Sequence, residues 1–282
     1  MNNLLTRSLT GILFVAILVG AICFSPTSFI ALFALITGLT MWEFSTLVND
    51  HAGAQVNRLI NSVAGVYLFV CIAGYCADLV PPKAFIPYLV TLVYLPVSEL
   101  YLRHSDPLKN WGYAFASQLY VALNLSMLSV LAFQYDPMSN QTVFQPALPL
   151  ALFVFLWTND TGAYCGGSLL HRRFPAKLFE RVSPKKSWVG SLSGGLLCLL
   201  AGYLFSLFCP GLLSLPQWLG MALVVCVFGT WGDLVESLLK RQLGVKDSGT
   251  LLPGHGGMLD RFDSSLLAIP AVVIYLYTIQ AF

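Results

Sequence analysis

Residues 188–209 read "WVGSLSGGLLCLLAGYLFSLFC", a stretch that contains no Asp, Glu, Lys or Arg. A helix needs roughly 17–25 predominantly apolar residues to cross the hydrocarbon core of a bilayer. The stretch has that length and composition, so it predicts a membrane-spanning helix. Similar apolar runs recur along the rest of the chain, and together they decide its fold class.

The composition of the whole chain agrees with this interpretation. Of its 282 residues, 57% are hydrophobic and only 10% are charged, and its mean hydropathy is +0.74. Soluble proteins carry about 25% charged residues. No alternating pattern of about ten residues indicates a membrane β-barrel. We therefore exclude an ordinary soluble domain and expect an all-α polytopic membrane protein, with residues 1–282 forming a single membrane domain.

The apolar runs predict nine transmembrane helices. The first run resembles a signal peptide, but residues 21–28, "AICFSPTS", offer no convincing small-residue cleavage site and further runs follow at once. The nine expected spans are residues 8–25, 28–47, 59–78, 84–102, 111–133, 147–170, 188–209, 217–238 and 264–281.

These nine spans divide the loops into two sets of very different charge. One set holds fourteen of the fifteen Lys and Arg residues, and the other set holds only Lys83. Loops rich in Lys and Arg stay on the cytoplasmic side of a membrane. We therefore expect the N-terminus in the cytoplasm and the C-terminus outside. Because no organelle-targeting segment is found, the expected location is a bacterial inner (plasma) membrane.

The seven cysteines lie singly in apolar segments. They show no Cys-x-x-Cys motif and no Cys/His spacing that is typical of metal sites. We expect them to be small buried hydrophobic side chains, not disulfides or zinc ligands.

Charged residues gather where the eighth expected span ends, in "GTWGDLVESLLKRQLGVKD" (229–247). On a helix, an i, i+3, i+4, i+7, i+8 spacing places on one face Asp233, Glu236, Ser237, Lys240 and Arg241. Acidic side chains at a membrane boundary that face a helix bundle indicate a functional site. The alternative is a helix end that carries ordinary i,i+4 pairs such as Glu236–Lys240. This stretch alone leaves both interpretations open.

The following loop, "KDSGTLLPGHGGMLDRFD" (246–263), adds two carboxylates, Asp260 and Asp263, immediately before the last span. Together with Asp233 they could bind Mg²⁺, which prefers oxygen ligands and usually works with substrate phosphates. The simpler alternative is a solvated basic loop that obeys the distribution of positive charge in membrane proteins. That alternative explains the basic residues but not the carboxylates and glycines.

The same loop has the features of a phosphate-binding segment. Gly254, Gly256 and Gly257 around His255 would allow backbone N–H groups to approach a phosphate closely. Positive charge for a polyphosphate would come from Lys240, Arg241, Lys246 and Arg261.

A second polar group lies on the sixth expected span and the loop after it. Asp160 sits within an apolar run, and an ionisable residue at that depth predicts a functional site. Ser183, Lys185 and Lys186 lead into the seventh span, where a helix N-terminus favours anions. The alternative is a basic cluster that binds anionic lipid headgroups. The small-residue spacings in this region are explained by close helix packing in membranes.

Residues 237–263, "SLLKRQLGVKDSGTLLPGHGGMLDRFD", resemble the C-terminal signature of the phosphatidate cytidylyltransferases (CDP-diacylglycerol synthases). Residues 159–164, "NDTGAY", and 183–190, "SPKKSWVG", resemble further segments of that family in the same order. The resemblance is strong over roughly the last 130 residues, within 147–282, whereas residues 1–134 agree only in being apolar. The matching signature positions are Ser237, Lys240, Arg241, Lys246, Asp247, Gly249, Pro253, His255, Gly256, Gly257, Asp260, Arg261 and Asp263.

The resemblance implies the reaction CTP + phosphatidate → CDP-diacylglycerol + pyrophosphate, with Mg²⁺ as cofactor and a second cation left open. It implies metal ligation by Asp233 and Asp260, with Asp263 as a further candidate. It also implies catalytic roles for Lys240 and Arg241. The residues expected to bind substrate are Asp160, Ser183, Lys185, Lys186, Ser237, Lys246, Asp247, His255, Gly256, Gly257 and Arg261. One departure is Val189, where the family usually has Glu or Gln, so we expect any polar role there to be absent or taken over by Glu180.

Two alternatives from the sequence are a CDP-alcohol phosphatidyltransferase and a transporter or lipid-binding protein. The first carries a D-x-x-D-G…A-R…G…D-x-x-x-D arrangement that this chain lacks. Transporter sites usually lie near the bilayer midplane, whereas most polar groups here collect at the expected cytoplasmic ends of the spans. The expected partners are CTP and phosphatidate in the bilayer, without nucleic acid, and a homodimer is suggested by the resemblance alone.

Overall fold

The computed structural model describes residues 3–170, 172–251 and 256–281, and side chains from residue 9 onward. The chain divides into two compact units. Unit 1 comprises Met1–Gln145 and Gln242–Phe262, and unit 2 comprises Pro146–Arg241 and Asp263–Phe282. The expected single domain stays a prediction, and each unit is described by itself.

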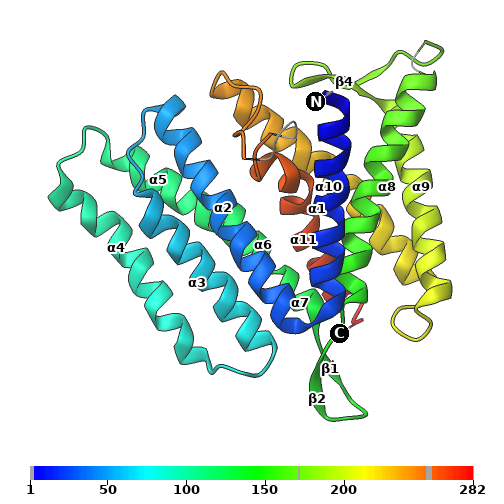
Figure 1. The fold of residues 1–282 in the computed structure, drawn as a ribbon, viewed down its shortest axis with the longest axis horizontal. Coiled ribbons are helices and arrows are strands. Elements are labelled where there is room, and N and C mark those ends of the chain that lie inside the picture. The colour runs from blue at the N-terminus through cyan, green and yellow to red at the C-terminus, as the bar shows by residue number, and fades with distance from the viewer. Residues whose placement is uncertain (1–2, 171, 252–255, 282) are drawn as a thin grey trace. The chain divides into compact units, whose positions relative to one another are not determined.

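Unit 1 is built from helices and one β-hairpin (Figure 1). Its helices are α1 (Asn3–Phe24), α2 (Pro26–Ala52), α3 (Arg58–Cys76), a short 3-10 helix (Pro82–Phe85), α4 (Ile86–Leu102), α5 (Pro107–Ser117), a π-helical turn (Gln118–Leu123), α6 (Asn124–Ser126) and α7 (Leu128–Ala132). Its strands are β1 (Phe133–Asp136) and β2 (Gln141–Phe144).

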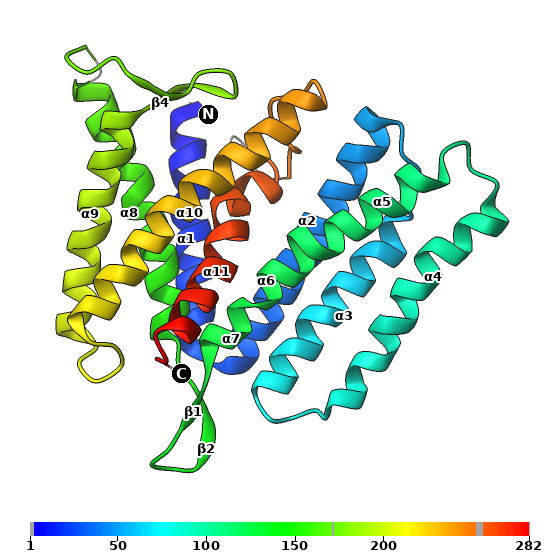
Figure 2. The same ribbon diagram turned by 180° about the vertical axis from the view of Figure 1, so that it is seen from behind.

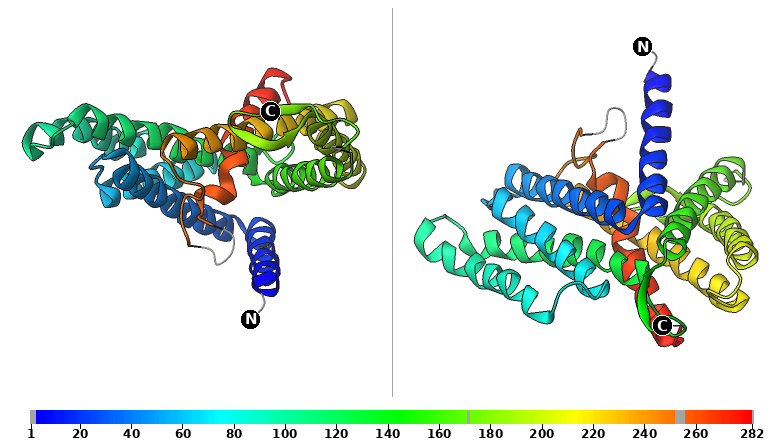
Figure 3. Two further views of the ribbon diagram at one scale, coloured as in Figure 1. Left: turned by 90° about the horizontal axis from the view of Figure 1, so that it is seen from above. Right: turned by 60° about the horizontal axis from the view of Figure 1, so that its bottom comes forward.

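Local sequence explains where α1 ends and where α2 begins and ends. The Ser25 side chain accepts the backbone N–H of Ser28, and the Ser28 side chain accepts that of Ser25, both at 3.0 Å. This reciprocal cap satisfies two amides that a helix start leaves without partners, and Pro26 suits the first helical position. The chain therefore turns sharply between the two helices (Figure 3). At its other end α2 stops at Gly53, whose φ of 66° is left-handed.

Buried polar side chains tie the helices of unit 1 together. The Asn61 amide of α3 donates to the hydroxyls of Ser117, at 2.7 Å, and Ser45, at 3.0 Å. The Gln118 amide donates to the Asn61 side-chain oxygen at 2.8 Å. Gln118 begins the π-helical turn, and α5, that turn, α6 and α7 continue along α3 (Figure 2). Such hydrogen bonds join helices where apolar burial alone gives little specificity.

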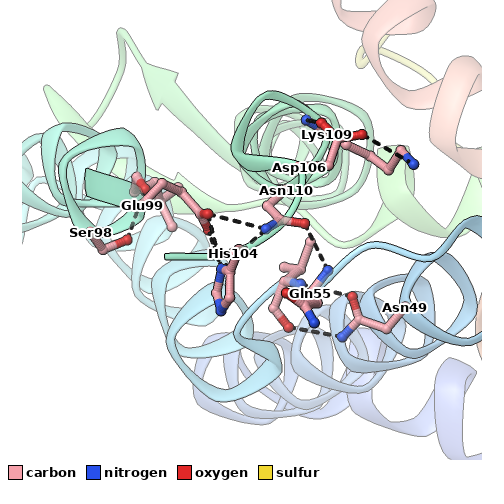
Figure 4. Close-up of polar contacts among 10 residues, drawn as sticks. Asn49, Gln55, Ser98, Glu99, His104, Asp106, Lys109 and Asn110 are labelled. Carbon is pink, nitrogen blue, oxygen red and sulfur yellow. Dashed lines mark hydrogen bonds and ion pairs between the residues drawn. The ribbon is translucent and has the colours of Figure 1, made fainter. Parts of the chain in front are cut away.

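A second polar network joins the ends of α4 and α5 to the loop after α2 (Figure 4). The Glu99 carboxylate lies 2.9 Å from Nδ1 of His104 and accepts the Asn110 amide at 3.1 Å. The Asn110 side-chain oxygen accepts the backbone N–H of Gln55 at 2.8 Å. We call Gln55, Glu99, His104 and Asn110 the Glu99 cluster.

The outward loop expected after the fifth span contains a hairpin. Strands β1 and β2 pair in antiparallel fashion, with Phe133 opposite Phe144 and Asp136 opposite Gln141. Both phenylalanines pack against Phe29 of α2, with ring centroids 6.4 and 5.7 Å away. The sequence did not predict these strands, because four-residue strands carry too little periodicity to be recognised.

Unit 2 contains α8 (Ala147–Leu170), β3 (Lys177–Phe179), β4 (Ser183–Ser187), α9 (Trp188–Phe208), most of α10 (Leu215–Gln242) and most of α11 (Leu259–Thr278). Helices α8 and α9 run side by side (Figure 1, Figure 2). A Cβ atom at Gly162 would lie 2.8 Å from Cα of Gly194, and one at Gly194 would lie 2.6 Å from the Asn159 carbonyl oxygen. This close approach agrees with the explanation of the small-residue spacings in this region by helix packing.

Among the described residues, six helical segments are long and apolar enough to cross a membrane: Pro26–Ala52, Arg58–Cys76, Pro82–Leu102, Pro107–Ala132, Trp188–Phe208 and Leu215–Gln242. They correspond to six of the nine expected spans, so the helical membrane class is confirmed and the count of nine stays a prediction. The described part of α1 adds a shorter apolar helix, Leu9–Phe24. Helix α8 coincides with the sixth expected span and contains Asp160, whereas α11 overlaps the last expected span and carries Asp263 just before it.

Candidate active site

Helix α10 carries two of the acidic residues of unit 2, Asp233 and Glu236. The Ser237 hydroxyl, one turn after Asp233, donates to its carboxylate at 3.2 Å. Lys240 forms an ion pair of 2.6 Å with Glu236, whose side chain is fully buried. The i,i+4 pair of Glu236 and Lys240 is therefore present, whereas the functional interpretation of this helix end stays a prediction. Breaking such a pair would leave a buried charge uncompensated, so Lys240 is held in place by Glu236.

Lys186 brings the β3–β4 hairpin to the same carboxylate. The Lys186 ammonium lies 2.7 Å from the Asp233 carboxylate, and both side chains are partly exposed. Ser187, the next residue, accepts the backbone N–H of Gly190 at 3.2 Å and so caps α9. The sequence predicted a loop over 171–187, but the segment that ends in Lys186 and Ser187 is strand β4, which pairs with β3.

A cavity of about 290 Å³ lies beside this ion pair, entirely within unit 2. Four of the predicted site residues line it: Asp160, Lys185, Lys186 and Asp233. Tyr164 and Thr230 line it as well. The second polar group of the sequence and the acidic face of α10 therefore meet at one cavity.

Asp263 adds a third acidic group to this region of unit 2. It lies in the first turns of α11, one residue before the last expected span. Burial raises the pKa of Asp263 to about 7, and the negative charges of Asp233 and Asp160 act in the same direction, opposed by Lys240. Burial is the largest cause of this raised pKa, because it disfavours the charged form of the carboxyl group. We call Asp160, Lys186, Asp233 and Asp263 the Asp233 cluster.

The donor set of the Asp233 cluster fits an oxygen-ligated cation. Mg²⁺ is typically held by one or two carboxylates and completes its shell with waters and substrate phosphates. Asp233 and Asp263 supply carboxylates, and Lys186 already places a positive charge against Asp233. Over residues 3–170, 172–251 and 256–281, no group of three or more His, Cys, Asp or Glu side chains forms a metal site by itself. Oxygens from substrate or water would therefore have to complete the coordination shell.

The signature loop of unit 1 is organised around Asp260. One oxygen of its carboxylate accepts the backbone N–H groups of Ser248 and Gly257, both at 2.9 Å. Gly256 has a left-handed φ of 80°, which favours glycine. His255 lies outside the described residues. Four predicted substrate or catalytic residues have exposed side chains on this segment and at the end of α10: Arg241, Lys246, Asp247 and Arg261.

Asp233 belongs to unit 2 and Asp260 to unit 1. Their predicted sharing of one metal ion therefore stays a prediction. Ser183 opens strand β4 and is half-buried, whereas Glu180, expected to replace the polar role lost at Val189, is exposed between β3 and β4.

Sequence reasoning missed two polar residues that the structure makes prominent. Asn159 is 3% exposed and lines the cavity, although it stands beside Asp160 in the quoted "NDTGAY" motif. Glu43 interrupts the second apolar run, 28–47, and its carboxylate accepts the backbone N–H of Leu259. The available signal for Glu43 was an ionisable residue within a predicted span, which marks a functional site by default.

Comparison with known proteins shows which family profile and which proteins the chain matches. The profile of the Cytidylyltransferase family matches residues 5–279. The chain is 27% identical to a protein of Haemophilus influenzae named phosphatidate cytidylyltransferase, over 92% of this chain and 93% of that protein. It is 44% identical to a protein of that name from Staphylococcus aureus (strain COL), over 45% of this chain and 48% of that protein. A Staphylococcus saprophyticus protein with the same name is 43% identical over 131 residues, 46% of this chain and 49% of that protein.

Proposed function

Because the chain belongs to the Cytidylyltransferase family, whose profile spans residues 5–279, we propose that it is a phosphatidate cytidylyltransferase of phospholipid biosynthesis. The proposed reaction converts CTP and phosphatidate into CDP-diacylglycerol and pyrophosphate. The observation that carries the proposal is the cavity of about 290 Å³ that is lined by both carboxylates and ammonium groups. Anionic substrates that react with the help of a cation require this combination of charges.

The reaction joins two anions, so charge neutralisation and positioning dominate it. A phosphate oxygen of phosphatidate forms a bond to the α-phosphorus of CTP, and the bond from that phosphorus to the departing pyrophosphate breaks. The attacking phosphate is already ionised at neutral pH, so no strong general base is needed. We assign Lys185 and Lys186, which line the cavity, to hold a substrate phosphate there.

Asp233 is proposed as the central metal ligand, together with Asp263. Asp260 is kept as a proposed ligand on the basis of the signature. When bound, Mg²⁺ would neutralise the phosphates and orient them for in-line displacement. The Ser237 hydroxyl and the Lys186 ammonium fix the direction of the Asp233 carboxylate, which supports a pre-organised site.

The remaining basic residues are proposed to stabilise the nucleotide phosphates and the departing pyrophosphate. Lys240 would act from a position fixed by Glu236, at 2.6 Å. Arg241, Lys246 and Arg261 have exposed side chains that can reach a soluble ligand. Asp160 is proposed to complete the polar lining of the cavity.

The proposed location is the inner membrane of a bacterium, with the active site facing the cytoplasm. The bacterial relatives support the organism class. The concentration of fourteen of the fifteen Lys and Arg residues in one set of loops supports the orientation. A homodimer stays an expectation from the family resemblance.

The test is an assay of the purified protein with labelled CTP, phosphatidate and Mg²⁺. We expect CDP-diacylglycerol and pyrophosphate in equal amounts, and no product when phosphatidate is replaced by diacylglycerol. Solute flux through reconstituted vesicles without any nucleotide turnover would contradict the proposal and favour a transporter.

A further inference from the structure

Glu43, in the middle of α2, contacts the signature loop more than two hundred residues later, within unit 1. Its carboxylate oxygen Oε2 accepts the backbone N–H of Leu259 at 2.9 Å. Leu259 is the first residue of α11. The first amides of a helix have no partner within the helix, and the helix dipole favours a negative charge at that end. Glu43 therefore fixes the start of α11.

Two glycines of the signature pack directly on the same carboxylate. A Cβ atom at Gly249 would lie 2.8 Å from Oε1 of Glu43, and one at Gly257 would collide with Oε2. The sequence predicted Gly257 as a position where backbone approaches a phosphate. The structure gives both glycines another reason, because any larger residue would displace Glu43.

The segment fixed by Glu43 also fixes Asp260. Leu259, which donates to Glu43, is the residue before Asp260, and Gly257 donates to Asp260 at 2.9 Å while it packs on Glu43. A displacement of Glu43 would therefore move a donor of Asp260 and the residue next to it.

Glu43 is also an energetically unfavourable residue for a purely structural contact. Its Oε1 atom is buried and has no hydrogen-bond partner among the described residues, and the same is true of the nearby Ser248 hydroxyl. A buried polar atom without a partner costs about 1–3 kcal/mol. A carboxylate retained at such a cost is typical of a functional position.

We propose that Glu43 is a positioning residue. It holds the signature loop at Gly257 and Leu259 and so directs the carboxylate of Asp260 toward the metal ion that Asp260 is proposed to bind. The proposal rests on the cytidylyltransferase function and extends its machinery to a helix of the N-terminal half. Residues that orient a metal ligand typically change metal affinity or activity by about 10–100-fold when they are replaced.

The first test compares Glu43→Gln with Asp50→Asn, an acidic residue near the end of the same helix whose side chain is exposed. The initial rate of CDP-diacylglycerol formation is measured at varied Mg²⁺, together with thermal unfolding in detergent. We expect Glu43→Gln to lower kcat by about 10-fold and to raise half-saturating Mg²⁺ several-fold. Its unfolding temperature should stay close to that of Asp50→Asn.

Two results would overturn the proposal. One is wild-type kinetics in Glu43→Gln. The other is a rate that falls only in proportion to the loss of folded protein, with half-saturating Mg²⁺ unchanged.

A double-mutant cycle tests the contact itself and does not require turnover. Gly249→Ala should lower the unfolding temperature in the wild-type background, and clearly less in Glu43→Asp, where the shorter side chain leaves room for the added methyl group. If the effects of Gly249→Ala and Glu43→Asp on the unfolding temperature are additive, the contact between the two residues is contradicted. If wild-type protein forms no CDP-diacylglycerol at all, the proposed function fails, while this cycle still decides whether Glu43 holds the turn.

Discussion

The Asp233 cluster and the Glu99 cluster differ in how their charges are balanced. In the Glu99 cluster the carboxylate meets His104 at 2.9 Å and the Asn110 amide at 3.1 Å (Figure 4). In the Asp233 cluster burial raises the pKa of Asp263 to about 7, and the negative charges of Asp233 and Asp160 add to this effect. The Glu99 cluster holds one carboxylate, whereas the Asp233 cluster holds three carboxyl groups and one ammonium group, that of Lys186, which pairs with Asp233 at 2.7 Å.

A cavity does not distinguish the two clusters. About 220 Å³ borders the Glu99 cluster, and about 290 Å³ borders the Asp233 cluster. Both also include residues from several elements. We propose that this difference in charge distinguishes the Asp233 cluster, as a site for ligands, from the Glu99 cluster, as a structural junction.

The largest effect is expected from a substitution in the Asp233 cluster. Asp233→Asn keeps the shape of the side chain but removes the charge that faces Lys186. We expect lipid-dependent CTP turnover to fall on the order of 10³-fold while the protein stays in the membrane. The matched variant Glu99→Gln should keep its turnover per folded molecule. Retained turnover in Asp233→Asn would remove this residue from the metal site.

The next effect concerns the scaffold that carries the Asp233 cluster. A methyl group at Gly194 would lie 2.6 Å from the carbonyl oxygen of Asn159, which is backbone and cannot move aside cheaply. We expect Gly194→Ala to destabilise the protein by about 1–3 kcal/mol in thermal unfolding. Gly112→Ala is the control, because in the described part of the chain a Cβ atom placed there meets no atom within 4 Å apart from its chain neighbours and the adjacent backbone of its own helix. Equal unfolding temperatures in the two variants would show that α8 and α9 are not packed this closely.

A smaller effect should follow from a change in the Glu99 cluster. Asn110→Ala removes the donor to Glu99 and the acceptor for the backbone of Gln55. We expect a loss of about 2 kcal/mol of stability, because buried groups are left without partners. Turnover per folded molecule should not change. A selective loss of turnover without destabilisation would place the Glu99 cluster in the active site and contradict its distinction from the Asp233 cluster.

The smallest effect is a pH dependence of Mg²⁺ binding at the Asp233 cluster. Because the pKa of Asp263 is raised to about 7, its carboxyl group is protonated below that pH, and a bound cation must displace the proton. Half-saturating Mg²⁺ should therefore rise by up to about tenfold per pH unit below about 7. Asp263→Asn should bind Mg²⁺ weakly, with no such rise. An identical pH profile in both proteins would show that another group titrates.

Much of this account could be predicted from the sequence, since hydropathy over about twenty residues identifies membrane helices. The 3.6-residue period placed these polar residues of α10 on one face. The structure pairs Ser237 with Asp233 and Lys240 with Glu236. The spacing of small residues likewise indicated close helix packing, but it did not predict that Gly162 would contact Gly194.

The remainder depends on contacts between residues far apart in the chain. No local pattern shows that Glu43 meets Leu259, or that Lys186 reaches Asp233, because those contacts follow from how the helices pack. The short strands β1 to β4 were missed for a related reason. Their pairing stabilises segments that are too brief to show a period of their own.

The assignment of the Asp233 cluster as the metal site is tested most directly by measuring cation binding without turnover. Mn²⁺ would replace Mg²⁺ and be counted by electron paramagnetic resonance in detergent-purified protein with CTP present, for wild type, Asp233→Asn and Glu99→Gln. We predict that wild type and Glu99→Gln bind Mn²⁺ with similar affinity and that Asp233→Asn loses at least one bound ion. Unchanged Mn²⁺ binding in Asp233→Asn would contradict the assignment of the Asp233 cluster as the metal site.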